Sequence, residues 1–420
     1  MLDRLSRITL RVTVVTIIGV VAATGQAQQK KVKDQGEYDL YNSVLKETDP
    51  NKRLGFLDQW NQKYPDSEFK KERLQYYLST YQALNNAARM ADAAKEILAM
   101  DPQDVTALYW LSLLTESLPP TAENLAAGEK AAKGLMAARK PEALKEEDWK
   151  NLKTEVIAHK TLGFIAAARK DTEAAEKHYT SVLELNPAFA QVSYALGVAI
   201  LQQKKPEKYP QALFHLCRAV VLTGVGAWPG DKKQIDAFLI KTYTTYHGST
   251  EGLDELKEKC KTSALPPPDL KILSKIEIEE LKAKELAEKD PKLALWLNIK
   301  GQLVGPEGQN YFENTLKGSD VPQLKGKVIS HKPALRPKEI VLGIEKADVP
   351  EVTLVLETAM PGKADPGTEI EFKGVPSAFT KEPFMVTFDV EGREKITGWP
   401  APAPAAKKAA PKKGGAAKKK

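Results

Sequence analysis

Histidines are the residues of this chain best suited to metal binding or proton transfer, and the sequence holds five of them. Metal ligation requires several such side chains to converge on one point, often through a fixed spacing such as H-E-x-x-H. The histidines occur instead one at a time, at His159, His178, His215, His247 and His331. In the repeat register described below, the first four fall on different helices at unrelated depths. We therefore interpret them as ordinary helix residues and predict no metal site.

Patterns for other reaction types are also missing from the sequence. It has no G-x-S-x-G, no Walker A loop and no paired C-x-x-C. One acidic group is interleaved with lysines, which is typical of a solvated helix face with ion pairs: Glu277, Glu279 and Glu280 beside Lys275, Lys282 and Lys284. We predict a non-enzymatic protein with no catalytic residues and no cofactor.

Cys217 and Cys260 are the two cysteines of the sequence. Both are predicted to lie late in helices, one helical hairpin apart. An oxidising compartment would permit a disulfide between them. We expect two small buried side chains instead, and the bridge stays an open alternative.

The net charge of +7 is concentrated at the two ends of the chain. The last residues carry seven lysines and no acid, which accounts for the whole excess: Lys407, Lys408, Lys412, Lys413, Lys418, Lys419 and Lys420. The first 27 residues add +2, so the body between the ends is slightly acidic, at about −2. Such a body lacks the basic stripe of a folded nucleic-acid-binding face, and we expect nucleic acid not to be a partner.

The beginning of the chain resembles an export signal. Arg4, Arg7 and Arg11 precede an apolar run over 12–23, and Gly25-Gln26-Ala27 offers a cleavage site. The run is short for a membrane span, which needs about 20 apolar residues. An uncleaved anchor is the alternative. We expect an exported protein, periplasmic or associated with the cell envelope, without a transmembrane segment in the mature chain.

An internal period defines the organisation of the body, which has helical apolar spacing from Tyr38 to about Lys289. Leu162-Gly163 and Leu196-Gly197 lie 34 residues apart. The first pair is followed by Ala175-x-x-x-Tyr179 and Pro187, and the second by Ala212-x-x-x-Leu216. These residues resemble the tetratricopeptide repeat, a helical hairpin in which small residues let two antiparallel helices approach closely.

Weaker copies flank this pair, at Tyr77–Pro102, at Leu239–Leu256 and within 38–65, and 105–150 forms an irregular copy with a longer loop. We expect five or six hairpins with atypical ends. The early Trp of the pattern is His159 or Ser193 here, and the first-helix Tyr is Ala166 or Ile200. The fold class predicted is mainly α, a tetratricopeptide solenoid of helical hairpins.

The resemblance implies that the first helix of each hairpin lines a concave groove that takes a protein or peptide partner. Projecting the register outward gives the predicted groove residues: Gln75, Ser79, Gln82, Tyr109, Leu113, Lys160, Phe164, Gln191, Tyr194, Val198 and Lys241. Aromatic and amide side chains suit an extended peptide or a partner helix. The carboxylate clamp of chaperone-binding members requires Asn where Phe164 and Val198 stand, so that specificity is not transferred.

The chain changes character after Pro266-Pro267-Pro268 and a charged helix. Strands are predicted within 326–330, 339–345, 351–357, 368–373 and 384–390. They resemble the strands of an OB-type barrel, with a small immunoglobulin-like sandwich as the alternative. The organisation expected is therefore a signal peptide (1–27), a flexible lead (28–36), a tetratricopeptide domain (37–265), a linker and charged helix (266–292), a small all-β domain (293–400) and a disordered tail (401–420).

Two functions follow from this organisation. The first is an exported scaffold that binds a protein or peptide in the groove of the solenoid. The second is a structural or tethering protein of the cell envelope, held to an anionic surface by its lysine-rich tail.

Overall fold

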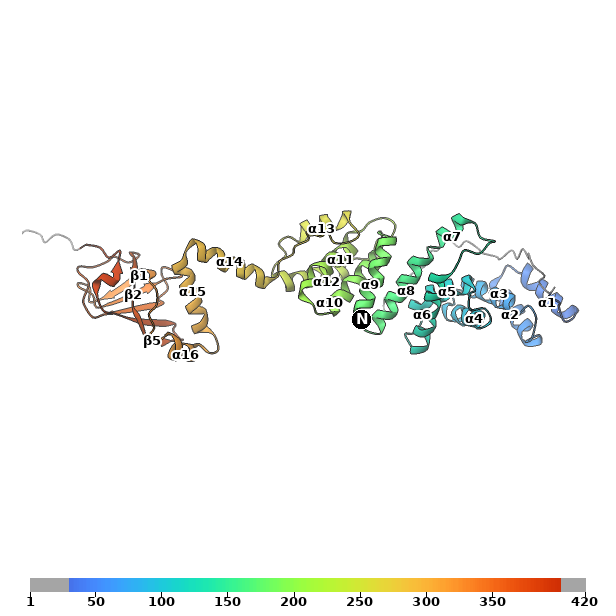
Figure 1. Ribbon diagram of the computed structural model, residues 1–420, viewed down its shortest axis with the longest axis horizontal. Coiled ribbons are helices and arrows are strands. Elements are labelled where there is room, and N and C mark those ends of the chain that lie inside the picture. The colour runs from blue at the N-terminus through green and yellow to red at the C-terminus, as the bar shows by residue number, and fades with distance from the viewer. Residues whose placement is uncertain (1–29, 402–420) are drawn as a thin grey trace, which may run out of the picture. The chain divides into compact units, whose positions relative to one another are not determined.

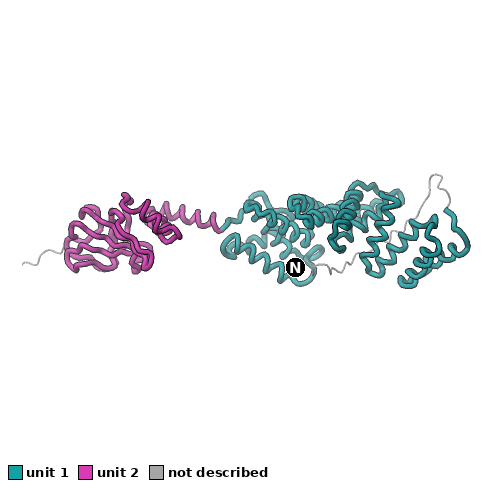
Figure 2. The backbone as a smooth tube through the Cα atoms, turned by 90° about the horizontal axis from the view of Figure 1, so that it is seen from below, with its two compact units in different colours: residues 1–274 teal, residues 275–420 magenta. Residues whose placement is uncertain are grey.

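The computed structural model describes residues 30–401. The chain divides after Ser274 into two compact units, a helical one and one that contains a sheet (Figure 2). The predicted signal peptide and the tail lysines lie outside the described residues. None of the helices within 30–401 is both long and apolar enough to cross a bilayer.

Within the described residues, six consecutive helix pairs build the first unit, and neighbouring pairs pack on one another in chain order (Figure 1). The first five hairpins are α1 (Gln35–Lys46) with α2 (Pro50–Lys63), α3 (Lys70–Ala83) with α4 (Ala87–Met100), α5 (Val105–Leu114) with α6 (Ala122–Ala137), α8 (Thr154–Ala168) with α9 (Thr172–Leu185), and α10 (Ala190–Gln202) with α11 (Tyr209–Val221). The sixth is atypical, because α12 (Lys233–His247) and α13 (Leu253–Thr262) both pack on α11. The predicted solenoid of helical hairpins is confirmed.

Glycine creates the close contact between paired helices. A Cβ added to Gly163 in α8 would lie 2.7 Å from two ring carbons of Tyr179 in α9. At the equivalent place in the next hairpin, a Cβ on Gly197 would lie 2.9 Å from Cγ of Leu216. The residues picked out by the 34-residue period are therefore the ones that touch, and the large partner fills the space that glycine leaves.

Two segments of the first unit differ from expectation. The predicted flexible lead already contains the start of α1, because Asp34 accepts a hydrogen bond from the backbone of Glu37 and another, at 2.6 Å, from the Tyr64 hydroxyl. The long loop of the irregular third repeat holds a short helix, α7 (Glu146–Leu152), between the third and fourth hairpins.

The second unit is not all-β, because helices precede its sheet. They are α14 (Lys275–Lys289), α15 (Pro291–Val304), α16 (Gly308–Tyr311) and a π-helical turn over Phe312–Leu316. Asp290 caps α15 and Pro291 stands in its first turn, a standard helix start. Trp296, Ile299 and Leu303 recur at helical spacing and are buried in the core of the sheet unit. The expectation that β structure begins at Leu293 was wrong.

The sheet has seven strands in the order β5-β6-β3-β2-β1-β4-β7. All five predicted strands are present, as β1 (Leu324–Lys332), β2 (Glu339–Gly343), β3 (Val352–Leu356), β4 (Glu369–Phe372) and β6 (Met385–Val390). Two strands were not predicted, β5 (Val375–Thr380) and β7 (Ile396–Thr397). Pro376 obscured β5 in the sequence, and it is tolerated there because β5 is an edge strand.

The predicted OB-type barrel is not confirmed. The edge strands β5 and β7 do not pair with each other, so the sheet stays open. β3 and β6 run parallel, whereas the other paired strands are antiparallel. The immunoglobulin-like alternative requires two sheets, whereas the seven strands of the described residues all join one.

Candidate functional site

The predicted groove residues lie on the first helices of successive hairpins, from the second hairpin to the sixth. They are Gln75, Ser79 and Gln82 on α3, Tyr109 and Leu113 on α5, Lys160 and Phe164 on α8, Gln191, Tyr194 and Val198 on α10, and Lys241 on α12. Gln75 and Lys241 are exposed and the others are half-buried. Half-buried positions hold side chains in place while leaving surface for a partner.

Some of these side chains are already engaged within the chain. Nζ of Lys160 lies 2.7 Å from Oε2 of Glu116 and 5.8 Å from the centre of the Phe189 ring. Tyr109 packs edge-on against Trp110, and burial raises the pKa of its hydroxyl. Lys160 connects neighbouring hairpins and Tyr109 packs within its own helix, so both offer less to a partner than the sequence suggested.

An aromatic surface, defined by Tyr194, Trp228 and Phe238, lies around α10 and α12. The Tyr194 ring centre is 5.3 Å from that of Trp228 and 6.0 Å from that of Phe238. Phe238 is 36% exposed and Trp228 is half-buried. Tyr194 was predicted from the repeat register, but its two aromatic neighbours were not.

The loop that carries Trp228 is fastened to the helices at both ends. The backbone N–H of Ala190, the first residue of α10, donates to Gly226 O at 2.8 Å. Gly226 has φ +86°, and a Cβ there would lie 1.6 Å from Ala188 O, so only glycine fits. Lys232 Nζ donates to Val220 O at 2.7 Å and caps α11. The loop therefore holds Trp228 against Tyr194.

Polar and charged groups border the aromatic surface. Lys241 is exposed on α12, three residues after Phe238, and residues at this spacing share a helix face. Gln191 stands three residues before Tyr194 on α10. Val225, in the fastened loop, is 95% exposed. The surface thus has an apolar centre, with an amide and a cation on the two helices that carry it.

Histidines come closer together than the sequence indicated. Nδ1 of His159 on α8 and Nδ1 of His178 on α9 are 3.0 Å apart, so the expectation of unrelated depths was wrong for this pair. At that distance one nitrogen carries a hydrogen and the other accepts it. Burial lowers the pKa of both rings. Within the described residues, no group of three or more His, Cys, Asp or Glu side chains is arranged to hold a metal ion.

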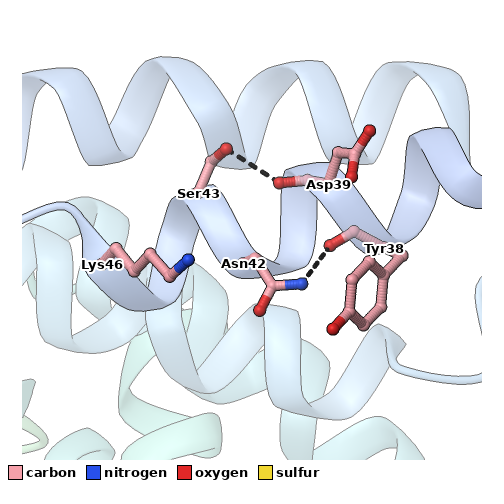
Figure 3. A pocket seen from close by; sticks show the side chains of 5 residues that line it. All are labelled: Tyr38, Asp39, Asn42, Ser43 and Lys46. Carbon is pink, nitrogen blue, oxygen red and sulfur yellow. Dashed lines mark hydrogen bonds between the residues drawn. The ribbon is translucent and has the colours of Figure 1, made fainter.

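Two shallow hollows are polar and carry no catalytic arrangement of side chains. The first lies over α1 and is lined by Tyr38, Asp39, Asn42, Ser43 and Lys46 (Figure 3). Its Asn42 amide and Ser43 hydroxyl donate to backbone oxygens one turn earlier in the same helix, each at 2.8 Å.

The second hollow is in the sheet unit, beside Lys325. The ammonium group of Lys325 is 3.8 Å from a carboxylate oxygen of Asp290 and 3.7 Å from one of Glu369. Its charge is therefore already paired.

Comparison with known proteins adds no family assignment. No protein-family model and no curated protein matches the chain. Similar solved structures include TTC0263, a thermophilic TPR protein of Thermus thermophilus, at 16% identity and TM-score 0.27, covering 49% of this chain and 94% of that one. PilW, a type IV pilus biogenesis factor, has 10% identity and TM-score 0.30, covering 54% and 91%. The TPR domain of P58(IPK) has 14% identity and TM-score 0.25, covering 67% and 72%.

The TM-scores and sequence identities of these solved structures are too low to establish a function for this chain. The description of the first unit as a stack of tetratricopeptide-like hairpins rests on the packing of the chain itself, above all on the contacts at Gly163 and Gly197.

Proposed function

We propose that this protein is a non-enzymatic scaffold that binds a segment of a protein partner on the aromatic surface of Tyr194, Trp228 and Phe238. The observation that carries the proposal is the partly exposed aromatic group held in place by a fastened loop. Pre-positioned aromatic side chains lose little entropy when a partner covers them, and they supply large apolar area.

The neighbouring side chains suggest the chemistry of the partner. A partner segment would place an apolar side chain over Phe238 and Trp228, bond its backbone to Gln191, and place an acidic group near Lys241. The inner face formed by the first helices would extend this contact as the predicted groove. Such a mode is typical of extended peptides and amphipathic helices.

The test is site-specific photo-crosslinking in cells that produce the full chain. A photoreactive phenylalanine analogue at position 238 should give a covalent adduct with one partner. The same analogue at Met136, which is 43% exposed on α6, is the matched control and should give no adduct with that partner. Adducts of equal yield at both positions would exclude the aromatic surface as the binding site.

Affinity measurements with the captured partner then test the individual side chains. Trp228→Ala and Phe238→Ala should each weaken binding about tenfold or more, as anchor residues of interfaces do. The control is Leu185→Ala, because Leu185 is 47% exposed at the end of α9. Circular dichroism must show that all three variants keep the helical content of the parent.

Attachment to the cell envelope is a second, separate proposal. It rests on the N-terminal export pattern and on the seven lysines within the last 20 residues. Each lysine near an anionic surface contributes about 1 kcal/mol. Removal of residues 401–420 should abolish salt-sensitive binding to anionic vesicles, and an intact protein that does not bind such vesicles would refute the tether.

A further inference from the structure

Cys217 and Cys260 occupy the same buried core cluster of the last two hairpins. Cys217 is on α11 and Cys260 is on α13, and both side chains are fully buried. The two helices pack directly against each other. The expectation that both cysteines are small buried side chains is confirmed, and in this structure both are free thiols.

The two sulfur atoms approach the same turn of α11. Cys260 Sγ lies 3.4 Å from the carbonyl oxygen of Phe214, three residues before Cys217. Side chains of an α-helix point toward its N-terminus, which places the Cys217 sulfur over that turn as well. Both cysteines therefore lie at the level of one turn of α11, within the same buried cluster.

Arg218 fixes this arrangement. Its guanidinium group is buried between elements and donates to Cys260 O at 3.2 Å, to Ser263 O, and to Pro187 O at 2.5 Å. These bonds hold the end of α13 against α11 at the level of the cysteines. A covalent link between the sulfurs would therefore join two helices that already pack against each other.

We propose that Cys217 and Cys260 form an intramolecular disulfide that clamps α13 to α11 when the protein matures in an oxidising compartment. The thiolate of one cysteine attacks a disulfide-bearing oxidant, forms a mixed disulfide and releases one thiol of the oxidant. The second cysteine thiolate then attacks the mixed disulfide and releases the other thiol. Two electrons pass to the oxidant, and the two protons lost by the cysteines leave with its thiols.

Burial of the two thiols determines when the disulfide forms during folding. Both thiols are enclosed in the folded unit, where the contact with Cys217 and burial raise the pKa of Cys260 and disfavour its thiolate. The bond therefore forms while α13 is docking, before the core closes. It spans the segment that carries Trp228 and Phe238, so it also restricts α12 and the loop beneath the aromatic surface.

The test is a thiol count on the full chain after folding in oxidised and reduced glutathione. The protein is denatured in guanidinium without reductant, treated with N-ethylmaleimide and weighed by mass spectrometry. We expect no added maleimide, and two after reduction, because the sequence contains only two cysteines. Proteolysis should yield one cross-linked pair of peptides. Two maleimides without reductant, a glutathione adduct on either cysteine, or a disulfide-linked dimer would overturn the proposal.

A stability measurement supplies an independent test. The oxidised protein should unfold at a temperature higher by about 5 °C or more than the same protein after reduction. The double variant Cys217→Ala, Cys260→Ala is the control, because reductant should not change its unfolding temperature. An equal response of the parent and this control to reductant would contradict a clamp between α11 and α13.

Discussion

Gly163→Ala tests the close helix contact on which the hairpin stack depends. The new methyl group would stand 2.7 Å from Cδ1 and Cε1 of Tyr179, about 1 Å inside the ordinary separation of carbon atoms. Tyr179 is only 6% exposed, so its ring has little room to move. The helices α8 and α9 must then separate, or the ring must leave its preferred position.

The expected magnitude comes from two opposing effects. Alanine favours a helix over glycine by about 1 kcal/mol. Forcing a methyl group into a packed core costs about 1–3 kcal/mol. Gly55 in α2 is the matched control, because no atom lies within 4 Å of a Cβ built there. Gly55→Ala should therefore be more stable than the parent by about 0.5–1 kcal/mol, and Gly163→Ala should be less stable than Gly55→Ala by about 1–3 kcal/mol.

The assay is urea unfolding followed by far-ultraviolet circular dichroism, with both variants measured beside the parent. Hydrogen exchange of α8 and α9 should locate the effect, because repeat arrays can unfold locally. Tyr179→Leu, made both in the parent and in the Gly163→Ala variant, completes a double-mutant cycle and should reduce the penalty of the added methyl group. If Gly163→Ala raises the urea midpoint as much as Gly55→Ala does, close packing at glycine does not explain the stack.

Three further predictions concern buried polar groups. Burial, with Arg218 nearby, lowers the pKa of His215 to about 3, so the contribution of the neutral ring to the free energy of unfolding is complete above the unfolded pKa of 6.5 and is lost as pH falls toward 3. The free energy of unfolding should drop by about 2 kcal/mol at pH 5. His215→Leu should flatten the pH dependence measured by urea unfolding. The lowered pKa values of His159 and His178 act in the same direction, because only one hydrogen fits between their facing nitrogens. The amide-exchange protection factors of α8 and α9, taken relative to the intrinsic exchange rate at each pH, should therefore fall below pH 6.5. Equal protection factors at pH 5 and pH 7 would refute this. Glu351 is 2% exposed, lies 2.5 Å from Lys300 Nζ and accepts two backbone hydrogen bonds at 2.8 and 2.7 Å. Glu351→Ala should therefore lower the unfolding free energy of the sheet unit, measured by urea unfolding, by about 2–4 kcal/mol. Glu382→Ala, at an exposed position, is the control and should not change it.

The helical hairpins could be predicted because their signals are local. Asp49-Pro50 starts α2, and α9 ends at Leu185, just before the Asn186-Pro187 step. The α15 helix was also visible in principle, through the Asp290-Pro291 start and the spacing of Trp296, Ile299 and Leu303. Short apolar runs are ambiguous between helix and strand, and this one directly precedes the β-rich part of the chain.

The candidate site was predicted only in part. Tyr194 follows from the register of its own helix, whereas Trp228 lies in a loop with no periodic pattern. The contact between them depends on Gly226 and its bond to Ala190, which are distant in sequence. A pattern of helix positions therefore finds Tyr194 but cannot find Trp228.

The sequence by itself determined the paired helices and five of the strands, because apolar period, proline and small residues act within one or two turns of chain. The tertiary structure decided which distant groups meet. The parallel pairing of β3 with β6, the approach of His159 to His178 and the burial of Cys217 and Cys260 in one cluster all join separate elements. Such contacts depend on how elements pack in three dimensions, which no local spacing along the chain encodes.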